Sequence, residues 1–256
     1  MTSTPPHTLY VITGASRGLG AAIAEQLLSP GVLMLCISRL PHPELTRLAR
    51  ECDARVEQWR RDLSHPAEVA DALEGWLQSF DNARFDCATL INNAGVMSRV
   101  GPAFECDEAD LSRALRVGLE APVLLTAAFL RQTARWHGER RVLNISSGLG
   151  RRPMAGVATY CAAKAGLDHF SRTVALEEAE RSNGARIVSL APGVIDTGMQ
   201  TQLRSADAAT FRDQPAFAAM KENGSLSSAH DAARSVIAWL ERPDFGDVVV
   251  ADVRSA

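Results

Sequence analysis

The chain has 256 residues, of which 46% are hydrophobic and 22% charged, and its 27 Lys and Arg against 30 Asp and Glu leave a formal net charge of -3. This length is enough for one substantial core, and the balanced charge argues against a protein that coats nucleic acid. The chain lacks an apolar run of about 18 residues, a secretory leader at its start and C-x-x-C pairs among its five cysteines. We therefore expect one cytoplasmic domain over residues 1–256, with a flexible segment at 1–7 and no nucleic-acid or membrane partner.

Short apolar runs rich in β-branched residues alternate along the chain with longer segments of helical periodicity. The apolar runs predict strands at residues 9–13, 32–38, 56–59, 89–92, 142–146, 187–190 and 248–250. The periodic segments predict helices at residues 18–28, 44–52, 66–80, 107–137, 158–179 and 229–240. Because helices between strands favour parallel pairing, the sequence predicts an α/β fold, a doubly wound seven-stranded parallel sheet with helices on both faces. The least periodic segment, 197–227, is expected to be a mobile excursion on the substrate side.

A glycine-rich turn follows the first predicted strand, where a helix begins. It contains, in a G-x3-G-x-G pattern, Gly14, Ser16, Arg17, Gly18, Leu19 and Gly20. Glycines there allow a pyrophosphate to approach the backbone, and the helix N-terminus supplies N–H groups and positive potential. A turn of small residues is the alternative interpretation, but this strand-to-helix position favours a dinucleotide.

The second predicted strand ends in Ser38 and Arg39, about twenty residues after the glycines. A protein that binds NAD usually has an acidic residue there for the ribose 2′-hydroxyl, whereas a 2′-phosphate is bound by arginine. Arg39 and Arg17 could place two guanidinium groups near such a phosphate, although two solvated arginines are the alternative in this arginine-rich chain. The sequence therefore predicts NADP(H) as the cofactor.

Tyr160 and Lys164 carry the sharpest chemical signal. Positions i and i+4 share one face of a helix, so the phenol and the ammonium can meet in one cleft. An ammonium nearby is expected to lower the tyrosine pKa, so that the phenol can exchange a proton with a carbonyl oxygen. Ser147 ends a strand thirteen residues before Tyr160, where its hydroxyl could bind a developing oxyanion.

Together these motifs resemble the short-chain dehydrogenase/reductase superfamily in its single-domain form, with a Rossmann-type fold, and the resemblance covers residues 9–250. It implies that Tyr160 donates the proton, that Lys164 lowers its pKa and holds the nicotinamide ribose, and that Ser147 orients the carbonyl. It further implies cofactor contacts from Asp62, Leu63, Asn93, Ala94, Gly95, Pro192, Gly193, Val194, Ile195 and Thr197. Members of this superfamily are usually dimers or tetramers, so a homodimer or homotetramer is expected.

Residues 144–148, 191–200 and 221–226 are similar to the sepiapterin reductase and bacterial benzil reductase branch, which reduces vicinal dicarbonyls with NADPH. Sepiapterin reductases place an Asp after the last of these stretches to bind the pterin amines. Here the position is taken by Ser228, which also opens a capping box with Asp231. The resemblance thus implies reduction of a small-molecule carbonyl, a vicinal diketone such as benzil, to a hydroxyketone. A pterin, ketoacyl or sugar carbonyl is the alternative substrate.

One residue departs from the family pattern. Members usually carry an Asn whose side chain holds a water behind the lysine, and here the aligned residue is Gly118. Either a water takes over, or the chain has become a weakly catalytic NADP-binding regulatory protein. We favour the enzyme, because the Ser–Tyr–Lys set is intact.

Several other residues allow two interpretations each. Asp196 is either a substrate contact or a turn residue. Five further side chains either line an apolar pocket or pack in the core, namely Met97, Met154, Val157, Met199 and Phe217. The six histidines show no metal-binding spacing, so no metal site is predicted.

Overall fold

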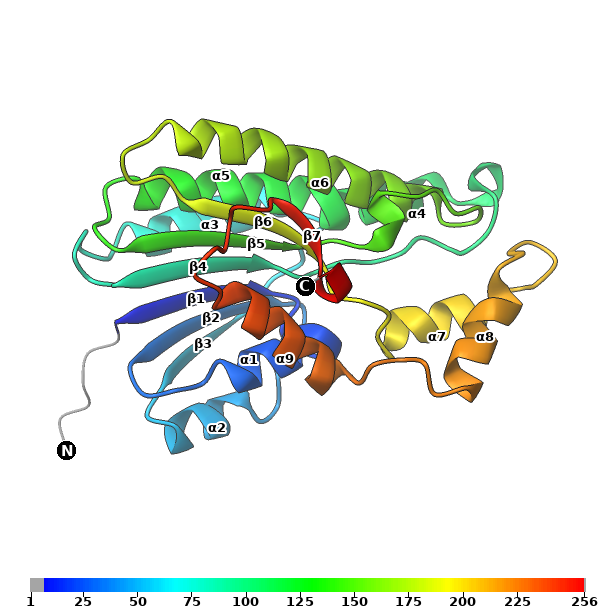
Figure 1. Ribbon diagram of the computed structural model, residues 1–256, viewed down its shortest axis with the longest axis horizontal. Coiled ribbons are helices and arrows are strands. Elements are labelled where there is room, and N and C mark those ends of the chain that lie inside the picture. The colour runs from blue at the N-terminus through cyan, green and yellow to red at the C-terminus, as the bar shows by residue number, and fades with distance from the viewer. Residues whose placement is uncertain (1–6, 256) are drawn as a thin grey trace.

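The computed structural model, which describes residues 7–255, has a single seven-stranded sheet (Figure 1). Its strands are β1 (Thr8–Thr13), β2 (Val32–Ser38), β3 (Arg55–Arg60), β4 (Cys87–Asn92), β5 (Glu139–Ile145), β6 (Arg186–Ala191) and β7 (Val250–Asp252). They are ordered β3-β2-β1-β4-β5-β6-β7, and every neighbouring pair is parallel. The predicted fold class is confirmed.

Helices cover both faces of this sheet, as Figure 1 shows. One face carries α1 (Gly18–Gln26), α2 (Leu45–Glu51) and α9 (Ala229–Leu240), and the other α3 (Pro66–Leu77), α4 (Glu108–Leu115), α5 (Ala121–Thr133) and α6 (Ala158–Ala179). Alternate side chains of β1 enter the two cores, with Ile12 packed on the first face and Val11 on the second. Because both faces are covered, the strand β2 is buried along its whole length and almost entirely apolar.

The strand order places a crevice at one edge of the sheet. The chain moves outward from β1 through β2 to β3 and then returns to add β4 on the other side of β1. Loops that follow β1 and β4 therefore diverge to opposite faces and leave an opening at the carboxyl ends of the strands. The segments after β1 to β6, which hold the predicted site residues, all begin at this edge.

Most predicted bounds differ by a few residues from the observed ones, and two of these differences have a clear physical cause. The helix expected at 107–137 is divided by a π-helical turn, Arg116–Glu120, between α4 and α5. Gly118 lies in this turn, and a Cβ atom added to it would lie 3.1 Å from the Cβ atom of Ala163. The last strand begins at Val250 instead of residue 248, because Val248 is exposed and pairing with β6 starts only at Val250.

Segment 197–227 leaves the sheet edge and returns to the same point. It forms α7 (Gly198–Arg204) and α8 (Gln214–Glu222), which project beyond the sheet in Figure 1. A short parallel bridge closes its base, where Ser227 N donates to Val194 O over 3.0 Å and Asp196 N donates to Ser227 O over 3.0 Å. The excursion is thus as expected, whereas its mobility stays a prediction. The predicted flexible segment 1–7 lies outside the described residues apart from His7, whose N–H donates to Gly31 O.

Candidate active site

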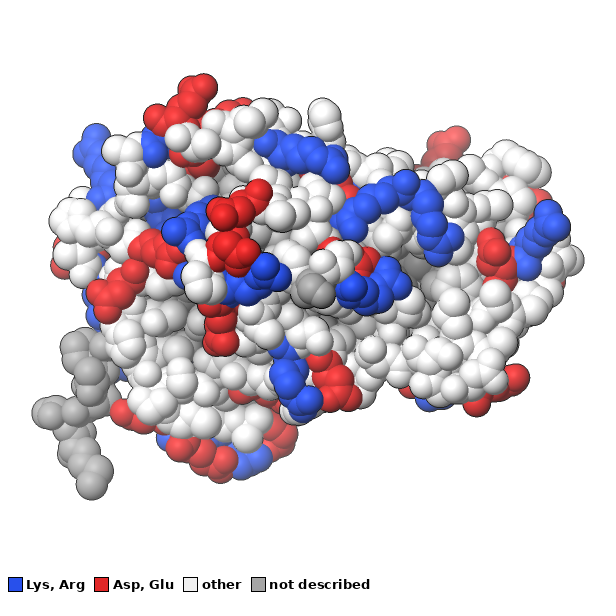
Figure 2. All heavy atoms as spheres, viewed as in Figure 1, with Lys and Arg blue, Asp and Glu red and all other residues white. Residues whose placement is uncertain are grey.

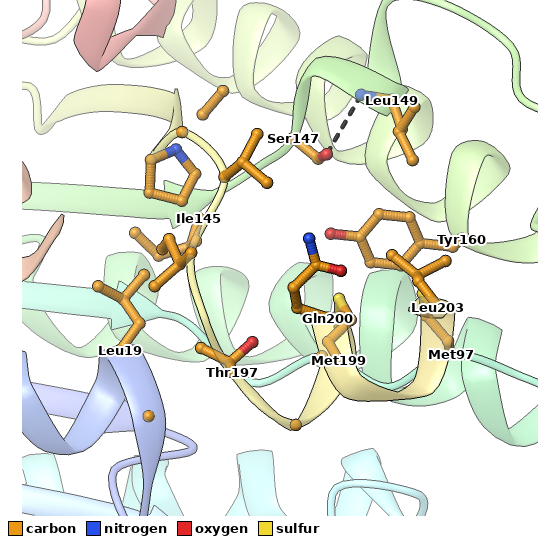
Figure 3. Close-up of a pocket in the computed structure, with 18 of the residues that line it drawn as sticks. Leu19, Met97, Ile145, Ser147, Leu149, Tyr160, Thr197, Met199, Gln200 and Leu203 are labelled. Atoms are coloured by element: carbon orange, nitrogen blue, oxygen red, sulfur yellow. Dashed lines mark hydrogen bonds between the residues drawn. The ribbon is translucent and has the colours of Figure 1, made fainter. Parts of the chain in front are cut away.

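Two adjoining cavities open along the carboxyl edge of the sheet, with volumes of about 760 and 400 Å³. Arg17, Ala94 and Gly95 line both of them, so they form one continuous crevice. Figure 3 shows the larger cavity, which lies between the end of β5, helix α6 and helix α7.

The crevice brings together every site residue predicted from the sequence. The smaller cavity is lined by Gly14, Ser16, Arg17, Ser38, Arg39, Asp62, Leu63, Ala94 and Gly95. The larger cavity is lined by Arg17, Gly18, Leu19, Gly20, Asn93, Ala94, Gly95, Ser147, Tyr160, Lys164, Pro192, Gly193, Val194, Ile195 and Thr197. The predicted nucleotide end and the predicted reaction end are therefore the two ends of one crevice.

The glycine turn after β1 has the backbone conformation that its sequence predicts. Gly14 and Gly18 have φ values of +70° and +58°, a region that favours glycine. Asn93 holds the turn, since its Nδ2 donates to Thr13 O over 3.0 Å and to Gly14 O over 3.2 Å. A Cβ atom on Gly20 would collide with the same Asn93 amide and with Gly14 O. The structure thus gives Asn93 a role in shaping the turn.

Basic side chains surround the smaller cavity. Arg17 and Arg39 line it as predicted, and Arg61 and Arg113 join them. Arg61 directly follows β3 and could have been found by reading the residue after that strand, whereas Arg113 comes from the distant α4 and has no sequence signal.

Two further polar side chains lie at this end of the crevice. The buried Ser38 hydroxyl has no hydrogen-bond partner within the described part of the chain. The backbone N–H of Ser64 and the Arg39 guanidinium keep the pKa of Asp62 below its ordinary value, so this carboxylate is charged at neutral pH. A buried free hydroxyl beside several arginines is suited to a phosphate or ribose ligand.

The predicted catalytic residues lie around one wall of the larger cavity. Tyr160 and Lys164 lie one turn apart on α6, and Ser147 follows β5. Figure 3 shows Ser147 and Tyr160 at the cavity. The Ser147 hydroxyl accepts from Leu149 N over 3.2 Å. The Lys164 Nζ atom donates to Ile145 O over 2.6 Å and lies 5.7 Å from the centroid of the Tyr160 ring.

The electrostatics of this pair correct one prediction. Burial raises the pKa of Tyr160 above its ordinary value, and a hydrogen bond with Ser147 only partly opposes this rise. Burial also lowers the pKa of Lys164 to about 8, against an opposing effect of Asp168. The predicted net lowering of the Tyr160 pKa is therefore wrong in this structure, because loss of solvation has the largest effect on this buried phenol. Tyr160 keeps its proton at neutral pH, as a proton donor requires.

Asp168 is a buried carboxylate next to the predicted catalytic side chains. It lies on α6 one turn after Lys164 and is 2% exposed. Its Oδ1 atom accepts from Ser146 Oγ over 2.5 Å and from Ser189 Oγ over 2.7 Å, and its Oδ2 atom accepts from Arg151 Nε over 3.2 Å. Asp168 thus joins β5, β6 and α6 next to the site. The sequence interpretation missed it, although its i+4 spacing from Lys164 was a signal.

The end of the larger cavity beyond Tyr160 is mostly apolar. Met97, Met199 and Phe217 line it as one interpretation expected, whereas Met154 and Val157 pack in the apolar cluster behind it. Leu149, Leu203 and the amide of Gln200 also line this end, and nothing in the sequence singled them out.

Asp196 lies at the border of the same cavity. Its carboxylate accepts from Lys221 Nζ over 2.6 Å and from Arg204 Nη1 over 3.1 Å. These two partners lower its pKa below the ordinary value. Asp196 therefore connects the start of the 197–227 excursion with α7 and α8, and the structure favours this turn role over a substrate contact.

The described part of the chain shows neither a membrane-spanning helix nor a metal site. Between residues 7 and 255, no helix is long and apolar enough to cross a bilayer. Within that range, no three His, Cys, Asp or Glu side chains gather so that they could hold a metal ion. On the face shown in Figure 2, acidic and basic side chains are intermixed without a broad patch of one sign.

Comparisons with known proteins agree with this geometry. The family model for short chain dehydrogenases matches residues 8–208. A benzil reductase ((S)-benzoin forming) of Bacillus cereus is 36% identical over 94% of this chain and 98% of the relative, and a sepiapterin reductase of Rattus norvegicus is 30% identical over 92% of each. The crystal structure of a short-chain dehydrogenase/reductase from Burkholderia vietnamiensis matches 98% of this chain and 99% of its own, with 36% identity and a TM-score of 0.66.

Proposed function

Since this chain belongs to the short-chain dehydrogenase family, whose reactions interconvert C=O and CH–OH groups, we propose that it is an NADPH-dependent reductase of vicinal diketones such as benzil. The product would be the hydroxyketone. The observation that carries this proposal is the convergence of Ser147, Tyr160 and Lys164 on a cavity that has an apolar end and continues into an arginine-lined one.

The residues of the smaller cavity fit NADP(H). Gly14 and Gly20 leave no room for side chains, so a pyrophosphate can approach the backbone at the N-terminus of α1. Arg17 and Arg39 would bind the 2′-phosphate, and the free Ser38 hydroxyl can donate to the same group. The resemblance adds Lys164 as a contact of the nicotinamide ribose. NADPH, when bound, would supply the hydride for the carbonyl carbon.

The chain's own residues would handle the carbonyl oxygen. The protonated Tyr160 hydroxyl donates a proton to this oxygen, and the Ser147 hydroxyl orients it by a hydrogen bond. The positive charge of Lys164 stabilises the phenolate that remains on Tyr160. Because burial lowers the pKa of Lys164 to about 8, this stabilisation declines as the pH rises through 8.

Two observations favour a diketone over a pterin. Ser228 serves as the N-cap of α9, where its Oγ accepts from Asp231 N over 3.0 Å and donates to Asp231 Oδ2 over 2.7 Å. The position at which sepiapterin reductases carry an Asp therefore has no acidic side chain and is used by the helix cap. The apolar lining of Met97, Leu149 and Leu203 also suits aryl or alkyl substituents better than polar pterin amines.

The proposal includes a homo-oligomer with a cytoplasmic location. Phe104 and Leu176 are 88% and 72% exposed, and contact between subunits would remove such apolar side chains from water. We expect a homodimer or homotetramer. The five free cysteines agree with a cytoplasmic location.

The direct test is NADPH oxidation by the purified protein in the presence of benzil, beside the same assay with NADH. We expect turnover with NADPH, formation of benzoin and a much lower rate with NADH. Tight NADPH binding without reduction of benzil or of other diketones would contradict the proposal and favour the regulatory protein.

Arg39→Asp tests the cofactor assignment. We expect kcat/KM for NADPH to fall about 10- to 100-fold, because the phosphate loses a charged partner and gains a repulsive one, whereas activity with NADH is kept or raised. Arg50→Asp is the matched control, since Arg50 is exposed on α2 outside both cavities. Unchanged NADPH preference in Arg39→Asp would place the phosphate elsewhere.

The pH dependence of reduction tests the role of Lys164. The ammonium is the protonated form, and its pKa is lowered to about 8, so the charge beside Tyr160 is lost as the pH rises through 8. We expect kcat/KM for benzil to fall with a midpoint near pH 8, and Lys164→Met to remove this titration along with most activity. The free energy of unfolding should instead rise with pH between about 8 and 10.5, because Lys164 binds its proton more tightly in the unfolded state than in the folded state. A rate that stays level to pH 10 would contradict the assignment.

A further inference from the structure

Gln200 is a buried polar side chain to which the roles described so far assign nothing. It lies on α7 and is 3% exposed. Within residues 7–255, neither its amide nitrogen nor its amide oxygen has a hydrogen-bond partner. An amide that is buried without a partner lowers the free energy of unfolding, so native proteins rarely contain one without a functional reason.

Neighbouring glutamines show that partners are within reach of this helix. Gln202, two residues further on α7, donates from Nε2 to Ser98 O over 3.0 Å, and Gln214 donates to Arg204 O over 2.6 Å. Gln200 instead points into the larger cavity, toward the Tyr160 hydroxyl (Figure 3). Its amide therefore faces the space where the substrate carbonyl would lie.

The apolar surroundings of the Gln200 amide strengthen its discrimination between ligands that form a hydrogen bond with it and ligands that do not. The same end of the cavity is lined by the apolar side chains of Met97, Leu149, Met199 and Leu203. In such a setting of low polarity a single hydrogen bond is strengthened, and a ligand that leaves the amide unpaired is penalised.

We propose that Gln200 is a specificity-determining residue that binds the second oxygen of a vicinal dicarbonyl, the oxygen next to the carbonyl that is reduced. This inference rests on the proposed function, because it takes the first oxygen to lie at Tyr160 and Ser147. Oxygens on adjacent carbons are close together, and Gln200 faces the same hydroxyl, so one small molecule can reach all three side chains. The amide N–H donates to the second oxygen, which is a carbonyl both in the diketone and in the hydroxyketone.

The test compares two substrates that differ in one oxygen. Benzil has two adjacent carbonyls, and deoxybenzoin has a methylene in place of one of them. We expect Gln200→Leu to lower kcat/KM for benzil about 10- to 100-fold and to leave that for deoxybenzoin essentially unchanged. Because the ratio is compared between wild type and variant, the different intrinsic reactivities of the two ketones cancel.

A structural role for Gln200 would give a different result. The leucine replaces an unpaired buried amide by an apolar side chain of similar size, so we expect the thermal midpoint not to fall. Gln202→Leu is the matched control on the same helix, since it lies outside the cavity and is expected to preserve the benzil-to-deoxybenzoin ratio. Gln200→Met provides the same test with an unbranched side chain if the leucine variant is unstable.

Two outcomes would overturn the role of Gln200, and only the second of them would also overturn the proposed reductase function. If Gln200→Leu keeps the wild-type ratio, or loses both substrates equally, Gln200 does not read the second oxygen, while the reductase function stands. If the wild-type protein reduces neither compound with NADPH or NADH, the proposed function fails and the role of Gln200 fails with it.

Discussion

Tyr160→Phe is expected to reduce the rate of carbonyl reduction about 100- to 10,000-fold while leaving the fold and NADPH affinity intact. The substitution removes one oxygen from a side chain that is otherwise held by packing on α6. Burial raises the pKa of this phenol, so at neutral pH it is the protonated donor in the cavity wall. Phenylalanine keeps the ring and its contacts but has no proton to give.

The measurement is single-turnover and steady-state NADPH oxidation with benzil, combined with NADPH titration by fluorescence. The chain has only two tyrosines, which makes Tyr10→Phe a matched control. Tyr10 lies on β1 away from both cavities, where burial raises its pKa to about 12. A Tyr160→Phe protein with near wild-type turnover would show that another group, such as Ser147, donates the proton.

Asp168→Leu is expected to lower the free energy of unfolding by about 3–5 kcal/mol, which corresponds to a fall of roughly 6–20 °C in the thermal midpoint. The loss of the carboxylate leaves the buried hydroxyls of Ser146 and Ser189 without an acceptor and removes the ion-pair partner of Arg151. Buried polar groups left unpaired are costly because water cannot reach them. Activity should fall as well, since Ser146 precedes Ser147.

Asp168→Asn separates the contributions to this loss. The amide oxygen can still accept from Ser146 and Ser189, whereas the charge facing Arg151 is gone, so a smaller loss is expected. Asp244→Leu is the exposed control, because Asp244 pairs only with Arg242 on the surface and its replacement should leave the midpoint unchanged. Urea unfolding of the three variants would measure the series. A midpoint for Asp168→Leu equal to that of wild type would show that the hydroxyls find other partners.

Local sequence patterns predicted part of the site, because the spacing of residues within one turn or one helix is visible in the sequence. Gly14, Gly18 and Gly20 follow a strand at a helix start, and the Tyr160–Lys164 spacing is one helical turn. Each pattern requires only the geometry of a single strand, turn or helix, and the parallel sheet then carries these segments to one edge. For this reason the glycine turn and the Tyr160–Lys164 pair line the crevice, as do the further residues that the family resemblance implied.

Other features of the site depend on which distant segments of the chain pack together and exclude water, and only the tertiary structure decided them. Asp168 became a buried acceptor because β5 and β6 bring Ser146 and Ser189 to it, and Gln200 became an unpaired amide because α7 folds back over the cavity. The Tyr160 pKa follows the same principle, since a helical spacing places an ammonium nearby but does not reveal how much solvent both groups lose. The sequence by itself determined the fold class, the glycine turn and the one-turn spacing of Tyr160 and Lys164, because local periodicity and spacing encode them. Solvation and long-range contacts arise only when the chain is packed. They decided the protonation of Tyr160 and Lys164, the hydrogen bonds of Asp168 and the position of Gln200 in the cavity wall.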